Sequence, residues 1–270
     1  GALNVPRSEH AGSGTKTAAL SFGGRNPVEG QTETYNGTAW TSVNNMNNAR
    51  AQLMGSGTQT STLASGGEPA LTVTETWNGT NWTEVSDLNT GKYASGAAGV
   101  SNTSSLVFGG RTPPYTTTTE SWDGSSWTEV NDMNTARGYL GGTGTKTAAL
   151  AFAGRIAPGA AISPAVTELW NGTNWTEVND MNTVRRTLAG AGVTTSALAF
   201  GGFIPPTTGA TEAWNGSSWT TVGTMNIARN LFGGGAGANN TSALAFGGPP
   251  ATTATEEWTD PGIITKTLTT

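Results

Sequence analysis

The chain has 270 residues, a net charge of −5 and no cysteine, and charged residues make up only 11% of it. The lack of cysteine excludes disulfides, thiolate metal sites and cysteine nucleophiles, and a single histidine, His10, excludes a multi-histidine metal cage. The mild acidity argues against nucleic-acid binding, and no apolar run approaches the roughly 20 residues of a membrane span. We therefore expect no cofactor, no metal, no nucleic-acid partner and no membrane insertion.

One motif recurs six times along the chain. An apolar segment ending in glycine returns every 43–48 residues, at Gly24, Gly67, Gly110, Gly154, Gly202 and Gly248. A first aromatic follows each of them, at Tyr35, Trp77, Trp122, Trp170, Trp214 and Trp258. In five copies a second aromatic comes five residues later, at Trp40, Trp82, Trp127, Trp175 and Trp219. A repeat of this length is typical of propeller blades.

Each copy reads as four strands in the same order. The first is rich in glycine, as in residues 141–144, and glycine is tolerated in a strand where backbones approach closely, as at the hub of a ring. The second is short and apolar, as in residues 196–202. The third and fourth are joined by Asn-Gly or Asp-Gly, which favour tight hairpin turns. No segment has the pattern of an amphipathic helix.

Six such units predict a single all-β domain over residues 1–270, a six-bladed β-propeller with four antiparallel strands per blade. The blades are expected at approximately 1–46, 47–88, 89–133, 134–181, 182–225 and 226–270. A linear β-solenoid is the structural alternative, but four strands per copy and the paired aromatics favour blades.

Opposite charges recur at two fixed positions of the repeat. A glutamate lies two residues before each first aromatic, at Glu33, Glu75, Glu120, Glu168, Glu212 and Glu256. A basic residue precedes each first strand, at Arg7, Arg50, Lys92, Arg137, Arg185 and Arg229. Because buried charges must be paired, these equal numbers predict a structural ring that ties the third strand to the first, within or between blades. The functional alternative is a ring of binding sites, one per blade.

The order of these motifs resembles the kelch repeat over essentially the whole chain. Each copy runs from Met-Asn-x-x-Arg or a variant of it through a small-residue strand and a Gly-Gly strand to the aromatic hairpin. The short hairpin, clearest at residues 170–175, is similar to the compact kelch-like repeats of marine phage and environmental bacterial structural proteins. The resemblance implies a propeller that acts as a binding or structural module.

One face of the propeller is expected to carry the variable loops. The loops between second and third strands differ in length and are stiffened by proline, in residues 25–31, 111–119, 155–166 and 203–210. Such loops on a rigid scaffold are where binding usually resides. Resemblance to kelch adaptors implies pocket positions just after Gly-Gly and at the entrance to each first strand. By position these are Arg25, Arg111, Arg155, Glu9, Gln52, Tyr139 and Thr187, with Tyr93 and Arg186 one residue earlier and Tyr115 within a loop.

Enzymatic interpretations lack the residues that they need. The copper site of galactose oxidase, which shares the kelch architecture, requires a cysteine-linked tyrosine and histidines. A sialidase needs an arginine triad and a Tyr–Glu pair, which is not legible here. A Ser-His-Asp triad would have to use His10, and no nucleophile-elbow motif lies near it. We therefore expect a protein that is not an enzyme.

The composition, rich in Thr, Ser, Asn and Gly, suits an exposed recognition or structural protein, extracellular or on a virion surface, whose partner is a protein or a glycan. A role for the protein as one part of a larger assembly is a further expectation. The alternative is a six-bladed lectin with sugar sites between its blades. Residues 119–127 resemble the hairpin motif of the fucose-specific lectins of this kind. There the glutamate is two residues before the tryptophan rather than three, which places it on the opposite face of the strand.

Two copies depart from the pattern. The second has Ser65 where the others have phenylalanine, which predicts a void and makes this blade the loosest. The last replaces the second tryptophan with Asp-Pro-Gly at 260–262, and residues 264–270 are expected to form its outer strand. No strand is evidently exchanged between the first and last blades to close the ring, unless residues 2–5 supply one. Without such a strand, we expect the junction of these two blades to fray.

Overall fold

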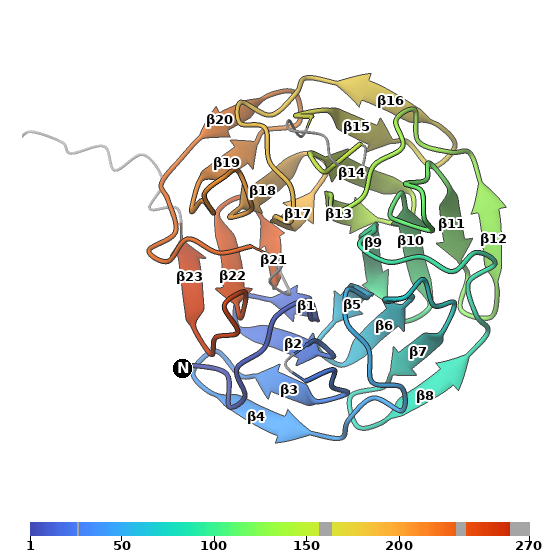
Figure 1. Ribbon diagram of the computed structural model, residues 1–270, viewed down its shortest axis with the longest axis vertical. Helices are drawn as coiled ribbons and strands as arrows, with labels where there is room; N and C mark the ends of the chain where they lie inside the picture. Colours follow the sequence, from blue (N-terminus) through green and yellow to red (C-terminus); the bar gives the residue numbers. More distant parts are fainter. Residues whose placement is uncertain (26, 157–163, 231–235, 260–270) are drawn as a thin grey trace, which may run out of the picture.

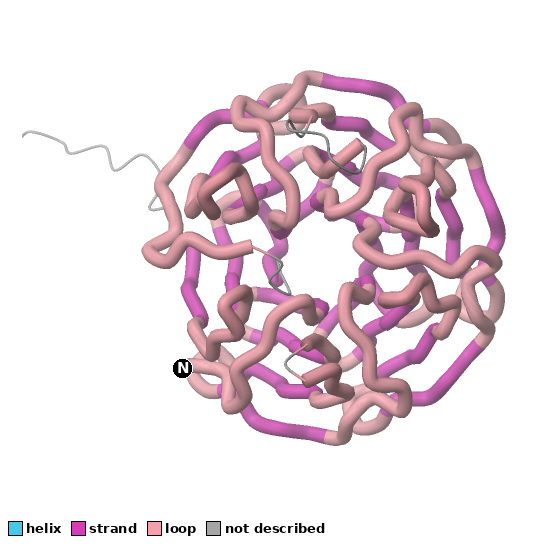
Figure 2. Tube along the Cα trace, viewed as in Figure 1, coloured by secondary structure: helices cyan, strands magenta, loops and turns pink. Residues whose placement is uncertain are grey.

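The computed structural model describes residues 1–25, 27–156, 164–230 and 236–259, and every regular element in them is a β-strand. Figures 1 and 2 show six sheets arranged around a central opening. The first strand of each sheet faces the opening, and the later strands lie progressively further out. The predicted all-β, six-bladed propeller is confirmed.

The strands follow one another in blade order. The first two blades contain β1 (Ala11–Thr15), β2 (Ala18–Phe22), β3 (Thr32–Tyr35), β4 (Trp40–Val43), β5 (Met54–Thr58), β6 (Ser61–Ser65), β7 (Thr74–Trp77) and β8 (Trp82–Val85). The next two contain β9 (Gly96–Ser101), β10 (Ser104–Phe108), β11 (Thr119–Trp122), β12 (Trp127–Val130), β13 (Gly141–Thr145), β14 (Ala148–Phe152), β15 (Thr167–Trp170) and β16 (Trp175–Val178). The last two contain β17 (Ala189–Val193), β18 (Ser196–Phe200), β19 (Thr211–Trp214), β20 (Trp219–Thr221), β21 (Ala236–Asn239), β22 (Ser242–Phe246) and β23 (Thr255–Thr259).

All neighbouring strands within a blade are antiparallel, and the register repeats from blade to blade. In each of the first five blades the two members of the aromatic pair face each other across the hairpin, as Trp77 faces Trp82. In the described part of the sixth blade, β21, β22 and β23 form a three-stranded sheet. The fourth strand expected over 264–270 lies outside the described residues.

Glycine in the first strands allows the blades to meet at the hub. A Cβ added to Gly142 of β13 would lie 2.8 Å from the Ala97 backbone nitrogen and 2.8 Å from the Phe108 ring, both in the preceding blade. No real Cβ tolerates such contacts without a shift of its neighbours, so the residue must be glycine. Hydroxyl pairs add polar links between neighbouring blades, such as Ser13 Oγ to Thr62 Oγ1 at 2.6 Å. The close approach expected from composition is therefore present.

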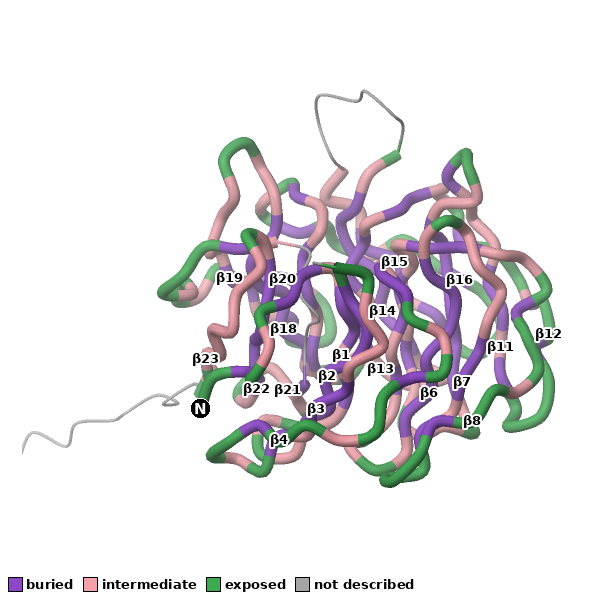
Figure 3. Tube along the Cα trace, turned by 60° about the horizontal axis from the view of Figure 1, so that its bottom comes forward, coloured by how far each residue is buried: buried purple, intermediate pink, exposed green. Residues whose placement is uncertain are grey.

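The apolar core lies between blades rather than within them. In four interfaces the second tryptophan of one blade packs on the phenylalanine of the preceding blade, and Trp82, for example, lies 5.0 Å from Phe22 between ring centroids. Its indole Nε1–H donates to the hydroxyl of Thr32, in the same preceding blade, at 2.9 Å. The contact to phenylalanine recurs in three further interfaces, and the bond to threonine in four. These buried rings pack blade against blade. Figure 3 shows that buried residues lie mainly along the strands and exposed residues mainly in the loops that connect them.

Met54 compensates for Ser65 in the second blade, and the looseness expected of this blade stays a prediction. Ser65 pairs across the sheet with Met54, whereas the phenylalanines at this position pair with glycine or alanine, as Phe108 does with Gly96. Met54 is buried and packs in one cluster with Trp127. It thus takes the place that the phenylalanine ring has in the other blades. The large and small residues have exchanged strands, and the total volume is kept.

Ser65→Phe alone is expected to destabilise the protein by about 1–3 kcal/mol, because the new ring and Met54 cannot both fit. Adding Met54→Gly should remove most of that loss, because the pair then matches Gly96 and Phe108. The measurement is a double-mutant cycle in urea unfolding. Additive effects of the two substitutions would contradict the exchange.

The first and last blades meet through the same type of contact as the others. Trp40 packs on Phe246 at 4.9 Å and donates its indole N–H to Thr255 Oγ1 at 3.1 Å. Leu3 is buried here, and its amide donates to the carbonyl of Thr253 at 2.9 Å. Residues 2–5 form no strand, so the alternative that they supply one to close the ring does not hold. Fraying of this junction stays a prediction.

Candidate binding face

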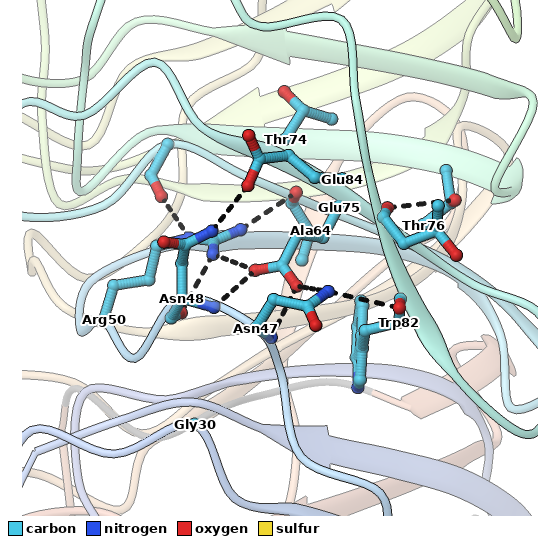
Figure 4. Close-up of polar contacts among 12 residues, drawn as sticks. Gly30, Asn47, Asn48, Arg50, Ala64, Thr74, Glu75, Thr76, Trp82 and Glu84 are labelled. Carbon is cyan, nitrogen blue, oxygen red and sulfur yellow. Dashed lines mark hydrogen bonds and ion pairs between the residues drawn. The ribbon is translucent and has the colours of Figure 1, made fainter.

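A buried ion pair in each blade joins the segment before the first strand to the third strand. Figure 4 shows the pair in the second blade, where Arg50 Nη1 donates to Glu75 Oε1 at 2.5 Å. Arg50 also donates to the carbonyls of Gly66 and Ala64, so its guanidinium bonds three parts of the blade. Both side chains are inaccessible to solvent. The arrangement anchors the entrance of the blade to its own sheet.

The same pairing recurs in the other blades, always within one blade. The N···O distances are 2.5–3.2 Å for Arg7–Glu33, Arg50–Glu75, Lys92–Glu120, Arg137–Glu168, Arg185–Glu212 and Arg229–Glu256. Burial lowers the pKa of Arg185 to about 10, and the charge of Glu212 opposes that shift. All twelve residues named in the sequence as a structural ring thus form ion pairs with one another, and eleven of them are at most 1% exposed, the exception being Glu256 at 15%.

The asparagine of the Met-Asn-x-x-Arg motif completes this network, a role that the sequence did not reveal. The Asn47 amide N–H and side-chain Nδ2 both donate to Glu75 Oε2, at 2.8 and 3.0 Å, and Nδ2 also donates to the carbonyl of Trp82 (Figure 4). The corresponding asparagines make the same amide bond to their glutamates in the other five blades. The only sequence feature that pointed to this role is the fixed position of the asparagine, three residues before the arginine in the repeat.

The loop face surrounds the mouth of a central channel, a cavity of about 210 Å³ that is lined by residues at the first strands of all six blades. Five residues there have positive φ angles of 53–57° although none is glycine: Glu9, Gln52, Ala94, Tyr139 and Thr187. Each of the last four donates its amide N–H to the carbonyl of the one before it, at 2.7–3.0 Å. These residues, here called the mouth ring, line a depression of about 110 Å³. The third blade contributes Ala94 to the mouth ring, and Tyr93, the residue before it in the sequence, is not part of this ring.

Around the first two blades the predicted face residues neutralise one another. Arg25 Nε lies 3.0 Å from Glu9 Oε2, and its Nη2 forms a close ion pair with Glu68. Gln52 Nε2 donates to the same Glu9 oxygen at 2.9 Å. With two carboxylates on one guanidinium, this sector of the face carries no excess positive charge.

Around the third and fourth blades, three of the four tyrosines of the chain gather beside Arg111. The Arg111 guanidinium carbon lies 5.7 Å from the centre of the Tyr93 ring, and Tyr115 meets Tyr139 edge-on at 6.4 Å. Backbone bridges tie Arg111 to both Tyr93 and Tyr115. The influence of Tyr93, and then hydrogen bonding with Tyr139, raises the pKa of Arg111, while burial raises that of Tyr139. We call these four residues the tyrosine cluster.

Two further arginines adjoin the tyrosine cluster. The Arg186 guanidinium carbon lies 4.6 Å from the centre of the Phe203 ring, a cation–π distance. Burial lowers the pKa of Arg186, and the positive charge of Arg155 lowers it further. Thr187 joins the mouth ring through its backbone. The face therefore has a neutralised sector and an aromatic, positively charged sector.

Sequence reasoning missed Glu68 and Phe203. Both follow Gly-Gly, as Arg25 and Arg111 do, so the same positional rule would have found them. Residues 26 and 157–163 of the predicted loops lie outside the described residues.

Comparison with known proteins bears on the fold. The chain is similar to a solved structure described as "Structure of YjhT", with a TM-score of 0.77 and 13% sequence identity over 97% of each chain. At that identity the likeness shows the fold alone. No family model matches the chain, and a search of curated proteins gave no match. Kelch membership stays a prediction from the motifs.

The described residues offer neither a metal-binding cluster nor a membrane-spanning helix. No group of three or more His, Cys, Asp or Glu side chains there could hold a metal ion. Nor does that part of the chain contain a helix long and apolar enough to cross a membrane.

Proposed function

We propose that this protein is a non-enzymatic binding module that holds a protein or glycan partner against the tyrosine cluster and the adjoining Arg155 and Arg186. Propellers of this kind typically serve as interaction modules. The observation that carries the proposal is the gathering of Tyr93, Tyr115 and Tyr139 beside Arg111 at the channel mouth. Tyrosine and arginine are the residues that most often dominate binding energy at interfaces.

Catalysis and sugar binding between blades have less support. His10, the only histidine, is buried against Phe246, and burial holds its pKa well below the usual range. The paired tryptophans and the glutamates of the ion pairs are occupied by packing and by their arginine or lysine partners, so a sugar placed between the first five blades would have to displace core contacts. In the tyrosine cluster, Tyr93 and Tyr115 are buried, and the partly exposed members that a partner would meet are Arg111 and Tyr139.

The composition supports an exposed setting for this module. Few charges, no cysteine and many Thr, Ser, Asn and Gly residues suit an extracellular or virion-surface protein, where it would act in recognition or as part of a larger assembly. Immunogold labelling of intact particles or cells with an antibody to the chain tests this: label only after lysis would contradict it.

Arg111→Ala is expected to weaken partner binding about ten- to a hundred-fold, because a hydrogen bond to a charged group contributes about 1.5–3 kcal/mol. The test selects binders of the wild-type protein from a displayed random-peptide library and from a glycan array, and then measures their affinity for the variant. Tyr139→Phe should have a smaller effect in the same direction.

The matched control is Lys146→Ala, which removes one positive charge from the turn between β13 and β14 on the opposite face. It should leave every selected affinity unchanged. Binders that respond equally to both alanine variants, or to neither, would contradict the proposed face. Several equivalent weak glycan sites per chain would instead favour the lectin.

A further inference from the structure

The single histidine of the chain lies at the junction where the first and last blades close the ring. His10 directly precedes β1 and is only 5% exposed. Its ring lies 5.6 Å, between centroids, from the ring of Phe246, the last residue of β22 in the sixth blade. A Cβ added to Gly247, the next residue of the sixth blade, would collide with His10 Cε1. The imidazole is therefore inserted from the first blade into the sixth.

In the second to fifth blades the position of His10 holds a side chain that does not titrate. Three residues after the ring cation stand Leu53, Ser95, Leu140 and Leu188, and the position in the sixth blade, 232, lies outside the described residues. Leu53 makes the same kind of contact as His10: a Cβ added to Gly23, the counterpart of Gly247, would lie 2.9 Å from Leu53 Cδ2. Leu53 packs in one cluster with Phe22, the counterpart of Phe246. At the closing junction, an imidazole thus replaces an apolar side chain.

Two buried arginines act on this imidazole, one from each of the two blades. Arg7 lies three residues before His10, and Arg229 of the sixth blade donates to the carbonyl of Gly247 at 3.1 Å. Both are 1% exposed. Burial, and then the positive charges of Arg7 and Arg229, lower the pKa of His10 well below its usual value, and a hydrogen bond with the Phe246 backbone opposes that shift. The closed junction therefore favours the neutral imidazole.

The carboxylates near this junction already have cationic partners. Glu33 and Glu256 form the ion pairs with the two arginines, and Glu9, the neighbour of His10 in the chain, lies 3.0 Å from Arg25 Nε. Tyr139, which lines the mouth depression together with His10, is neutral below pH 7. The strands β1, β2 and β22 contain no titratable side chain, and neither does the sequence Leu-Phe-Gly-Gly-Gly of residues 231–235. A proton on His10 therefore adds a positive charge beside ion pairs that are already neutral.

We propose that His10 is a pH-sensitive latch of the ring: a proton on its imidazole opens the junction of the first and sixth blades in mildly acidic surroundings, while the other junctions stay closed. A third cation beside Arg7 and Arg229 would have to be buried with them, which is costly without a partner of its own. The leucine and serine side chains at the same position of the second to fifth blades cannot take up a proton. The inference goes beyond the proposed binding function and does not depend on it.

The direction of the pH effect follows from which form of the junction binds the proton. In the opened junction the imidazole is in water and takes up a proton near pH 6.5, whereas in the closed junction it is still neutral at that pH. Opening therefore becomes more favourable as the pH falls below 6.5, by up to about ten-fold in its equilibrium constant for each pH unit. The range from pH 7 to pH 5 lies above the usual pKa of carboxylates, so the ion pairs of the blades stay charged.

The test uses the absence of cysteine from the chain, because a single introduced thiol then reports the opening of one junction. Ala19→Cys places a thiol in the buried cluster that contains Phe246. The matched control is Ala149→Cys, at the same position of the fourth blade, in the cluster that contains Phe108 of the third. The rate of labelling by a dithiodipyridine reagent is measured for both full-length variants, and their ratio cancels the intrinsic effect of pH on the thiol. From pH 7 to pH 5 the rate for Ala19→Cys should rise about ten-fold or more relative to the control.

His10→Leu, which installs the side chain that Leu53 has in the second blade, should abolish this rise in the ratio. The proposal is overturned if the ratio does not change with pH, or if it rises equally in the His10→Leu background. Urea unfolding of the chain without introduced cysteines is a second measurement that does not need either cysteine variant to fold. The stability of His10→Leu relative to the unsubstituted chain should increase as the pH falls from 7 to 5, and a constant difference would also overturn the proposal.

Discussion

Replacing Arg137 by alanine is expected to destabilise the protein by about 3–5 kcal/mol, because one partner of a fully buried ion pair is removed. Arg137 donates to Glu168 at 2.8 Å and to the carbonyls of Ala153 and Val166 at 2.9 and 2.6 Å. Its loss leaves a buried carboxylate without its cation, and it leaves the buried carbonyl of Ala153 and the partly buried carbonyl of Val166 without this donor. In a chain of this length the loss corresponds to a fall in Tm of roughly 6–20 °C, measured by calorimetry.

Two further variants identify the cause of that loss. Replacing Arg137 and Glu168 together, by methionine and leucine, should recover much of the stability, since the uncompensated charge is then gone. Lys146→Ala, at a partly exposed lysine, should change stability by no more than about 0.5 kcal/mol. A double variant as unstable as Arg137→Ala would show that the charge itself was not responsible.

Trp175→Ala is expected to cost about 3–5 kcal/mol, the usual range for truncating a buried tryptophan. Trp175 packs on Phe108 at 4.8 Å and on Trp170 at 5.4 Å, and its indole N–H donates to Thr119 Oγ1 at 3.1 Å. The substitution therefore opens a cavity between the third and fourth blades and removes one of the hydrogen bonds that join them. Equilibrium unfolding in urea measures the change.

Trp258→Ala provides the comparison. Trp258 is partly exposed, and no second tryptophan of its own copy packs against it, so the loss should be clearly smaller than for Trp175. Equal losses at the two positions would contradict the view that the stability of the ring comes from paired rings between blades. Hydrogen exchange should in addition show faster opening at β12 and β13 in Trp175→Ala, since the two blades that it joins are loosened.

The sequence was sufficient for features that repeat. Asn-Gly turns, glycine-rich first strands and paired aromatics fall at fixed intervals, so the blade architecture could be predicted from period alone. Six acidic and six basic residues recur at fixed positions of the repeat, and these positions likewise predicted that the opposite charges form ion pairs. Each of these features is imposed by local geometry that every blade shares.

Features that differ between blades could not be predicted in this way. Met54 compensates for Ser65 through a cross-strand pair, and Glu68 reaches Arg25 from a neighbouring blade. Lys92 replaces arginine where Thr118 supplies a hydroxyl at 2.9 Å, in the place where Arg137 bonds the carbonyl of Val166. Such pairs depend on three-dimensional proximity, and the repeat period carries no information about them.

At the channel mouth, the chain joins blade to blade through main-chain atoms while five chemically unlike side chains project from the same backbone conformation. A carboxylic acid, an amide, a methyl group, a phenol and a hydroxyl occupy equivalent positions in five successive blades, and these positions are called stations below. The scaffold thus separates what holds the rim together from what the rim displays. Residues at these stations can be exchanged to alter specificity with little penalty to folding, in the manner of hypervariable loops on an antibody framework.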